Sequence, residues 1–463
     1  EMQEGLVVVE GSPRLGWVME SPENGTRQSA YEIDIREAFT GRSVWNSGKV
    51  YSTQSQLVSI EGADIRPDNP FNYSWRVRVW DETDALSEWS REAKFRSASS
   101  RLSEGKWIGA ITRQNAHLPE GRKFHGGELK KPEVKAAWEA VDTLAKKSIC
   151  LRRTFQVGDR TEGNTNRQSG KKIVEATAYV CGLGFYEFSL NGKKVGNSEF
   201  APLWSDYDKT VYYNTYDVTE QLRRGENVVG ILLGNGFYNV QGGRYRKLQI
   251  SFGPPTLLFE LVINYEDGTC TTVHSDNNWK YDFSPVTFNC IYGGEDYDAR
   301  REQKGWNQIG FDDSHWRPVV IQEAPKGILR PQMAAPVKIM ERYDIQKVTK
   351  LNADQVASAS VSTKRTVDPS AFVLDMGQNL AGFPEITVRG KRGQKVTLIV
   401  AEALTEEGAC NQRQTGRQHY YEYTLKGEGD ETWHPRFSYY GFRYIQVEGA
   451  VLKGQKNPQK LPV

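Results

Sequence analysis

The feature that most constrains the fold is a long stretch of alternating apolar and polar residues in the middle of the chain. It runs from Ala178 to Tyr238 and reads AYVCGLGFYEFSLNGKKVGNSEFAPLWSDYDKTVYYNTYDVTEQLRRGENVVGILLGNGFY. Such alternation is typical of half-buried β-strands, and the breaks at Gly-Leu-Gly and Asn-Gly are turn signals. The stretch therefore predicts short antiparallel strands joined by tight turns.

The same pattern recurs through most of the 463 residues, which is enough chain for about three domains. We predict an all-β chain of tandem β-sandwiches. Residues 1–98 are expected to form a fibronectin III-like or immunoglobulin-like sandwich, 148–322 a jelly roll, and 323–463 a further β-sandwich. Residues 99–147 are predicted to be a linker with one short helix, because PEVKAAWEAVDTLAKK has apolar residues at roughly helical spacing.

Composition and charge exclude several classes of function. Lys and Arg total 60 against 58 Asp and Glu, so the net charge of +2 indicates no polyanion-binding tract. The five cysteines contain no CxxC pair and predict neither a disulfide scaffold nor a zinc site, and Cys181 and Cys290 are expected to be buried thiols. No apolar run approaches the ~20 residues that span a membrane. The chain begins EMQEGLVVVEGSPRLGW without a signal peptide, which suggests a processed or trimmed N-terminus.

Motifs in all three units resemble a single protein family. They are SPRLGW and YSWRVRVWD in the first unit, GLGFYEFSLNGKKVG, PLWSDYDKTVYYNTYDVT and GGEDYDAR in the second, and LDMGQNLAGF and FSYYGFRYIQVEG in the third. Each motif is weak alone, but their order along nearly the whole chain is similar to that in the N-terminal β-domains of bacterial α-L-rhamnosidases, which are inverting glycoside hydrolases. The resemblance implies a galactose-binding-like jelly roll for the second unit.

In that family the β-domains lead into an (α/α)6 barrel that carries the catalytic acid and base, near a segment resembling RDERxGWxGD. No such segment occurs in this sequence. The resemblance therefore implies the non-catalytic β-domain portion of a periplasmic or extracellular enzyme that removes terminal L-rhamnose from plant glycans. These domains would position the barrel and bind carbohydrate, and the chain alone is expected not to hydrolyse aryl rhamnosides.

Two other interpretations remain open. The chain could be a free-standing carbohydrate-binding or adhesion module, or an enzyme whose site lies in the sandwiches. In GGEDYDARRE, Asp296 and Asp298 would share one face of a strand, so a carboxylate pair could act in acid–base chemistry. The same cluster, with Glu295, could instead form an ion-paired turn with Arg300 and Arg301, contact the barrel, or bind sugar or an ion.

A second candidate sugar site is the turn motif PLWSDY. Aromatic rings are abundant, with 12 Trp, 22 Tyr and 18 Phe, and such rings either pack between strands or stack on the apolar faces of sugars. Trp204, Asp206 and Tyr207 could form a stacking surface with a polar edge. The alternative is that Trp204 fills the core and Asp206 caps a turn.

Calcium is a candidate cofactor, because some members of the family bind a terminal rhamnose through calcium in the second sandwich. Side chains with suitable oxygen atoms lie on turns of this unit, namely Asn191, Asn197, Asp206, Asp208, Asn235 and Asn239. Their spacing is not that of an EF-hand, and each could instead accept backbone hydrogen bonds within its own turn.

The third unit is expected to carry an exposed aromatic patch in FSYYGFRY, where a barrel would dock. The patch would comprise Tyr439, Tyr440 and Phe442. Exposed apolar patches of more than a few hundred Å² usually mark interfaces.

Overall fold

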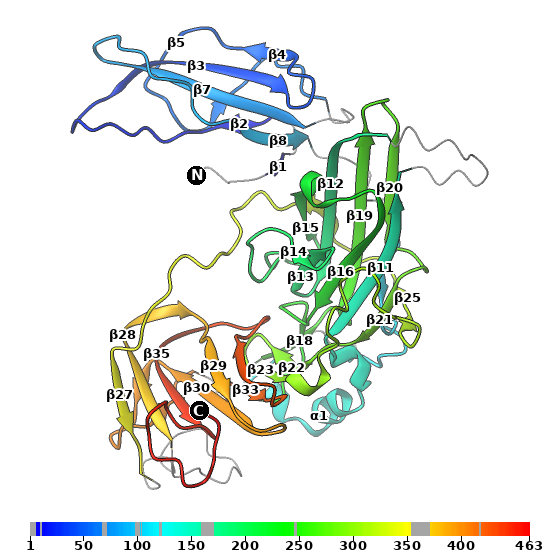
Figure 1. Cartoon of the computed structure of the whole chain (residues 1–463), viewed down its shortest axis with the longest axis vertical. Helices are drawn as coiled ribbons and strands as arrows, with labels where there is room; N and C mark the ends of the chain where they lie inside the picture. The colour runs from blue at the N-terminus through cyan, green and yellow to red at the C-terminus, as the bar shows by residue number, and fades with distance from the viewer. Residues whose placement is uncertain are drawn as a thin grey trace.

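The computed structural model describes residues 6–9, 12–66, 72–97, 102, 104–119, 123–158, 171–244, 248–352, 371–415 and 418–463. Figure 1 shows three β-rich units, coloured blue, green and orange to red, which follow one another along the longest axis of the molecule. One α-helix, α1 (Pro132–Glu139), occurs within the described ranges, and nearly all other regular structure is strand. The predicted fold class, tandem all-β sandwiches with one short helix, is therefore confirmed.

The first unit is built on a six-stranded sheet. Its strands are β1 (Leu6–Val9), β8 (Ala93–Ser97), β7 (Tyr73–Asp81), β3 (Gln28–Glu37) and β4 (Ser43–Asn46) in spatial order, with β5 (Val50–Tyr51) also paired to β3. A two-stranded sheet of β2 (Arg14–Leu15) and β6 (Val58–Ser59) faces it. Alternate residues of β3 and β7, such as Ile33, Ile35 and Val77, are buried because successive side chains of a strand point to opposite faces.

The second unit contains two large sheets. One has the order β14 (Lys193–Lys194), β13 (Tyr186–Leu190), β16 (Gly225–Leu233), β11 (Ile149–Val157), β21 (Lys280–Phe283) and β24 (Arg317–Pro318). The other has the order β25 (Val320–Ile321), β9 (Ile108–Gly109), β19 (Thr256–Tyr265), β12 (Ile173–Leu183), β15 (Thr210–Asp217) and β26 (Ile328–Pro331), with β20 (Cys270–His274) paired to β19. Short 3-10 turns at Thr219–Gln221 and Ala299–Arg301 complete it.

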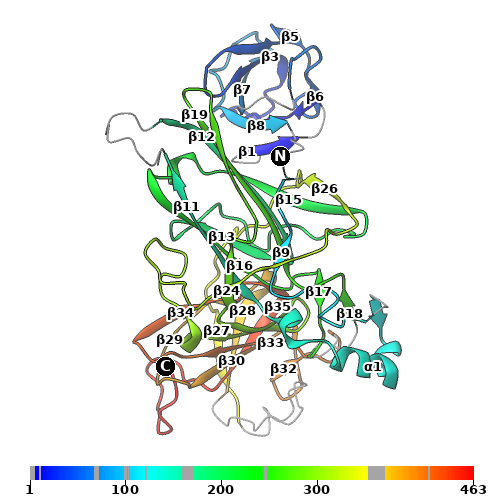
Figure 2. The same cartoon turned by 90° about the vertical axis from the view of Figure 1, so that its right-hand side faces the viewer.

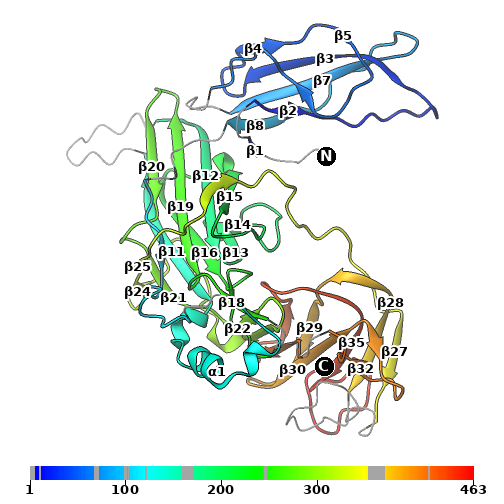
Figure 3. The ribbon, with the colours of Figure 1, turned by 180° about the vertical axis from the view of Figure 1, so that it is seen from behind.

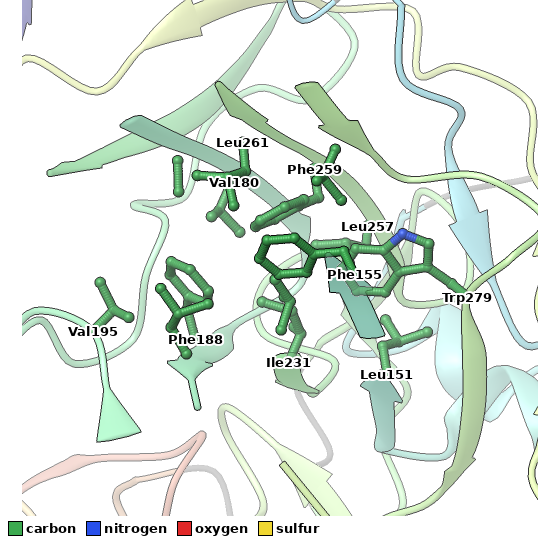
Figure 4. Packing of buried hydrophobic residues seen from close by; sticks show 14 of the residues in the cluster. Leu151, Phe155, Val180, Phe188, Val195, Ile231, Leu257, Phe259, Leu261 and Trp279 are labelled. Atoms are coloured by element: carbon green, nitrogen blue, oxygen red, sulfur yellow. The ribbon is translucent and has the colours of Figure 1, made fainter. Parts of the chain in front are cut away.

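The core of the second unit lies between these two sheets. Phe155, Phe188, Ile231, Phe259 and Trp279 meet there, as Figure 4 shows, and the two phenylalanines 188 and 259 pack edge to face with ring centroids 5.7 Å apart. Cys181 and Cys290 are buried thiols, as predicted, and all five cysteines are unpaired. This large apolar core holds the strands of the second unit in place, and with them the turns that join the strands.

The described residues of the stretch predicted as a linker, 99–147, pack closely on the second unit. Its strand β9 joins one of the two large sheets, and β10 (Lys123–His125) forms a three-stranded sheet with β18 (Leu248–Ser251) and β17 (Asn239–Val240). Helix α1 begins at Pro132 and buries Trp138 against Ile111 and Val141. The helix is shorter than the sequence pattern suggested, because the Asp142 carboxylate accepts the Leu144 N–H and starts a separate 3-10 turn at Thr143–Lys146.

A buried ion pair joins the first unit to the second. Arg96, on β8, donates from Nη1 to Oε1 of Glu175, on β12, at 2.8 Å, and the two side chains are only 4% and 7% exposed. The other carboxylate oxygen of Glu175 accepts the backbone N–H of Asn72 at 2.9 Å. Beside it, Lys94 and Asp217 form a more exposed ion pair at 3.2 Å.

The third unit is centred on a seven-stranded sheet. Its order is β22 (Val286–Cys290), β23 (Gly294–Asp298), β33 (Tyr420–Thr424), β30 (Lys395–Ala401), β35 (Tyr440–Glu448), β28 (Phe372–Gly382) and β27 (Lys347–Lys350). Two small sheets accompany it, β29 (Ile386–Arg389) with β34 (Asp430–Trp433), and β31 (Ala403–Leu404) with β32 (Cys410–Asn411). The hairpin β22–β23 comes from the second unit in sequence, and β23 pairs in parallel with β33. One sheet is therefore shared between two units.

Residues 332–346, here called the connecting segment, lead from β26 in the second unit to β27 in the third. Figures 1 and 3 show them as an extended, irregular length of chain that runs between the two units. The view in Figure 2 shows the second unit lying between the first and the third. Hydrogen bonds and an ion pair hold the segment to both units. Gln332 N donates to Tyr213 O at 2.9 Å, and Glu199 N donates to Val337 O at 2.8 Å. Arg342 pairs with Glu385 at 2.7 Å, and Gln346 N donates to Asp375 O at 2.9 Å.

Candidate functional site

Trp204 is the most exposed tryptophan among the large apolar side chains of the described residues, with 64% of its surface open to solvent. It follows β13 and its loop, in the turn that leads into β15. Its ring centroid lies 5.7 Å from that of Phe237, so one edge of the indole is supported by protein while the rest faces water. The ring is therefore available to a sugar or to another protein surface, and it does not fill the core.

The other two residues of the predicted stacking surface point elsewhere. Asp206 closes the turn, since its carbonyl oxygen accepts the N–H groups of Lys209 and Thr210 at 2.8 Å. Lys209 also pairs with the Asp206 carboxylate, and this hydrogen bond lowers the pKa of that carboxyl. Tyr207 is 5% exposed and packs edge to face on Tyr238 at 5.1 Å. The structure does not bring Trp204 and Tyr207 together.

A chain of aromatic rings extends from Trp204 across the boundary between the second and third units. Phe237 contacts Tyr292 and Phe185, Phe185 contacts Phe200, and Phe200 contacts Phe383 and Tyr439, with ring centroids between 5.0 and 5.9 Å apart. We call this set the ring cluster. Its two most exposed members, Trp204 and Tyr439, are linked through Phe237, Phe185 and Phe200. Phe237, Tyr292 and Phe383 are partly exposed.

The aromatic patch expected in FSYYGFRY is only partly exposed. Tyr439 is 39% exposed, Tyr440 is half-buried, and Phe442 is 2% exposed. Phe442 was wrongly expected at the surface: it lies on β35 with its side chain directed into the core of the third unit. Sequence reasoning also missed Phe200, Phe237 and Phe383, whose roles depend on contacts between distant segments.

Glu295 of the GGEDYDAR motif is completely buried and joins the two units. Its carboxylate accepts the backbone N–H of Arg436 at 2.9 Å and that of Phe437 at 2.8 Å. Burial raises the pKa of Glu295 to about 8, while these amide donors and the Arg436 guanidinium act in the opposite direction. Glu295 thereby holds residues 436 and 437, which precede β35, against β23. Its side chain is not open to solvent.

The two aspartates of the motif are held by different arginines. Asp296 pairs with Arg244, whose guanidinium lies 3.6 Å from the centroid of the Tyr420 ring. Asp298 caps the turn that follows β23 and accepts hydrogen bonds from Arg300 at 2.8 Å and Arg301 at 3.3 Å. Burial raises the pKa of Asp296, whereas the hydrogen bond from Arg300 lowers that of Asp298. The arrangement is that of an ion-paired strand end, in which each carboxylate is held by its own arginine partners.

We expect the stability of the chain to show a pH dependence that Glu295→Gln removes. A carboxyl whose pKa is about 8 when folded and ~4.3 when unfolded binds more protons in the folded state between those values. Its contribution to stability is therefore fully present below about pH 4 and is lost as the pH rises toward 8. Urea unfolding at pH 5 and pH 8 should show a smaller decrease in the variant than in the wild type. Equal decreases would contradict the assignment.

The calcium candidates do not form one ligand set. Asn191 Oδ1 accepts the Val228 N–H at 2.9 Å, Asn235 Oδ1 accepts from the amide of Asn239 at 2.7 Å, and Asn197 and Asp208 lie on exposed turns. Over the described part of the chain, no group of three or more His, Cys, Asp or Glu side chains converges as a metal site would require. The residues present do not fit a calcium ion at these turns.

Within the described part of the chain, no helix has the length and apolar character to cross a membrane.

Three family models match successive parts of the chain. They are the Rha78A-like N-terminal immunoglobulin domain at residues 1–100, the α-L-rhamnosidase N-terminal domain at 171–341, and the bacterial α-L-rhamnosidase concanavalin-like domain at 365–462. Their order agrees with the three units of the structure.

Whole-chain comparisons point to the same group. An α-L-rhamnosidase of Formosa agariphila is 34% identical over 97% of this chain and 45% of its own length. The structure of a Streptomyces avermitilis α-L-rhamnosidase complexed with L-rhamnose superposes with a TM-score of 0.75 at 26% identity, covering 100% of this chain and 56% of that one. An Aspergillus terreus α-L-rhamnosidase gives 0.74 at 26% identity, covering 99% and 47%. The chain spans about half the length of these relatives. Its three units match, in order, the N-terminal β-sandwich domains of the α-L-rhamnosidases.

Proposed function

We propose that this chain is the non-catalytic β-domain portion of an α-L-rhamnosidase-like glycoside hydrolase and that it positions the catalytic barrel of the same polypeptide. The parent enzyme removes terminal L-rhamnose from plant glycans in the periplasm or outside the cell. The three supporting units correspond to residues 1–98, 148–322 and 323–463, except that β9 and β10 of the stretch 99–147 join sheets of the second unit and the hairpin β22–β23 joins the sheet of the third. The proposal is supported by relatives of about twice this length and by the apolar surface of the connecting segment.

The connecting segment has several large apolar side chains that are open to water. A segment that stayed in contact with water would be expected to have mostly polar side chains. The apolar side chains are between 41% and 84% exposed and comprise Met333, Val337, Ile339, Met340, Tyr343 and Ile345. Scattered single apolar residues are normal on protein surfaces, but six within one segment indicate a surface that another body covers. This exposure is the observation that carries the proposal.

The apolar residues of the connecting segment are continuous with the ring cluster. Val337 is hydrogen-bonded to Glu199, the neighbour in sequence of Phe200, whose ring contacts Tyr439 at 5.0 Å. At the other end, Arg342 pairs with Glu385, two residues beyond Phe383 of the cluster. We therefore define the docking surface as the six apolar side chains of the connecting segment with the exposed rings of the cluster, and we propose that the barrel rests on it.

Hydrogen exchange tests this docking. Residues 332–346 should exchange more slowly in the parent polypeptide than in this chain alone, because the barrel shields their amides. A triple variant, Ile339→Ser with Met340→Ser and Ile345→Ser, should change the melting temperature of the isolated chain little, since these side chains are exposed. In the parent it should lower activity and restore rapid exchange. Val18→Ser with Leu57→Ser, which are 68% and 63% exposed on the first unit, is the control.

Equal exchange in the two proteins would contradict the docking proposal. The sequence of the gene beyond residue 463 provides an independent test. A downstream barrel of several hundred residues with paired carboxylates supports the proposal, whereas an immediate stop codon supports a free-standing carbohydrate-binding or adhesion module.

Carbohydrate binding is the second candidate function, and the exposure of Trp204 favours it. Its indole is 64% exposed and leans on Phe237, which leaves ring surface for stacking on a sugar. Calorimetric titration of the chain with L-rhamnose should give weak binding that Trp204→Ala decreases. Tyr51→Ala, a 78% exposed ring on the first unit, is the matched control. Parallel titrations with calcium and with EDTA test the cation, and the absence of heat in all of them would leave these domains as supports.

A further inference from the structure

A small pocket opens at the side of the second unit, in a place to which neither the family match nor the docking surface assigns a role. It has a volume of about 150 Å³, which suits one sugar ring better than an oligosaccharide. Five separate segments line it. The residues that matter for its chemistry are Arg113, Tyr207, Tyr238, Phe252, Glu323 and Lys326.

One wall of the pocket is apolar and rigid. Tyr207 contacts Tyr238 and Phe252, each at 5.1 Å between ring centroids, and Tyr238 stacks on Phe252 at 5.9 Å. Pro254 and Pro325 extend this wall. The three rings belong to a buried cluster of the second unit, so the wall is in place before any ligand arrives.

The polar groups of the pocket retain unused hydrogen-bonding capacity. Arg113 is half-buried and donates from Nη1 to Phe252 O at 2.7 Å, but no carboxylate among the described residues pairs with it. An arginine carries five N–H donors, so most of its capacity remains. Within the same described ranges, the Tyr207 hydroxyl, the Glu323 carboxylate and the Lys326 ammonium also have no hydrogen-bonding or ionic partner.

We propose that this pocket is a subsite for one neutral sugar ring. Sugar hydroxyls both donate and accept, and the pocket offers strong donors in Arg113 and Lys326, an acceptor in Glu323 and a group that does both in Tyr207. The opposite charges of Glu323 and Lys326 favour a neutral ligand over an anion or a cation. The apolar wall suits the C–H face of a sugar ring. The choice of a sugar rests on the proposed function, whereas the location of the site rests on the pocket alone.

This subsite is distinct from Trp204. Trp204 does not line the pocket, and its ring contacts Phe237, whereas Tyr207 contacts the next residue, Tyr238. Variants can therefore separate the two sites. Tyr207→Phe keeps the ring packing and removes only the hydroxyl, and Lys326→Ala removes an exposed side chain, so neither should unfold the chain.

Titration of the full chain with L-rhamnose and with D-galactose, followed by NMR and calorimetry, tests the proposal. At least one of these neutral sugars should bind, and Tyr207→Phe and Lys326→Ala should each weaken that binding about three- to tenfold, as expected for loss of one hydrogen bond. Lys209→Ala, which replaces an exposed lysine paired with Asp206, should leave it unchanged. The same titrations in Trp204→Ala should still show the share of the binding that Tyr207→Phe and Lys326→Ala weaken. D-Galacturonate should bind no more tightly than D-galactose.

Three results would overturn the subsite. They are no saturable binding of either neutral sugar, binding that only Trp204→Ala removes, and much tighter binding of D-galacturonate. The second result would leave the proposed carbohydrate-binding function intact and move it to Trp204. The third would make the pocket an anion site.

Discussion

Gly294→Ala should detach the hairpin β22–β23 from the sheet of the third unit and produce one of the largest losses of stability available from a single methyl group. Gly294 has a φ of +92°, and a Cβ atom there would lie 1.9 Å from the carbonyl oxygen of Tyr420, its partner in the parallel pairing of β23 with β33. The backbone of Tyr420 cannot move aside as the end of a flexible side chain could. The strained φ costs about 1–3 kcal/mol and the overlap a similar amount, so we expect a total of about 3–5 kcal/mol.

Hydrogen exchange locates this effect. Amides of residues 294–298 and 420–424 should exchange faster in Gly294→Ala, and urea should unfold the third unit at lower concentration. Gly429→Ala is the matched control, because Gly429 has a φ of +101° but no atom within 4 Å of the added Cβ. The difference between the two variants measures the overlap with Tyr420. Similar losses in both would show that backbone strain alone accounts for the effect.

Glu175→Ala should release the first unit from the second. The variant leaves the Arg96 guanidinium buried without its carboxylate and the Asn72 N–H without its acceptor. Removing one partner of a buried ion pair typically costs about 3–5 kcal/mol, because the remaining charge stays desolvated. Burial raises the pKa of Glu175, and Arg96 and the Asn72 amide oppose that shift, so the ionised carboxylate depends on both contacts.

Lys94→Ala provides the matched control at the same boundary. The Lys94 and Asp217 side chains are 49% and 28% exposed, and exposed pairs contribute about 0–1 kcal/mol. Differential scanning calorimetry should show a transition of the first unit at lower temperature in Glu175→Ala and little change in Lys94→Ala. Limited proteolysis between residues 97 and 107 should accelerate only in the former. Equal effects of the two substitutions would mean that the buried pair does not hold the boundary.

The strands were predictable because their signal is local. Alternation within Tyr186–Leu190 or Tyr73–Asp81 needs only neighbouring residues to be recognised, and the buried thiols of Cys181 and Cys290 follow from the same pattern. The ion-paired turn at Asp298 was also among the alternatives, since Arg300 and Arg301 are adjacent in sequence. The family could be recognised because several motifs occur in order along the chain.

The arrangement of the candidate sites was not predictable in the same way. Trp204 and Tyr207 lie on a turn, where the alternation of side-chain directions does not hold, so their separation required the structure. The partners of Glu295 come from residues 436 and 437, far along the chain, and no pattern near Glu295 indicates them. The pocket likewise combines five segments that no sequence window contains.

The parallel pairing of β23 with β33 has a consequence for how the molecule can be divided and folded. The two strands of the hairpin β22–β23 come from before the connecting segment, and the other strands of their sheet come after it. The sheet of the third unit therefore cannot close until both parts of the chain have been synthesised. A fragment cut at the connecting segment would leave β33 as an open edge with unpaired N–H and C=O groups, a template for aggregation. The pairing is also strongly non-local, which slows folding, and it ties the last two sandwiches together. Any shorter version of the chain should therefore keep both sandwiches, beginning before Ile108 and ending after Glu448.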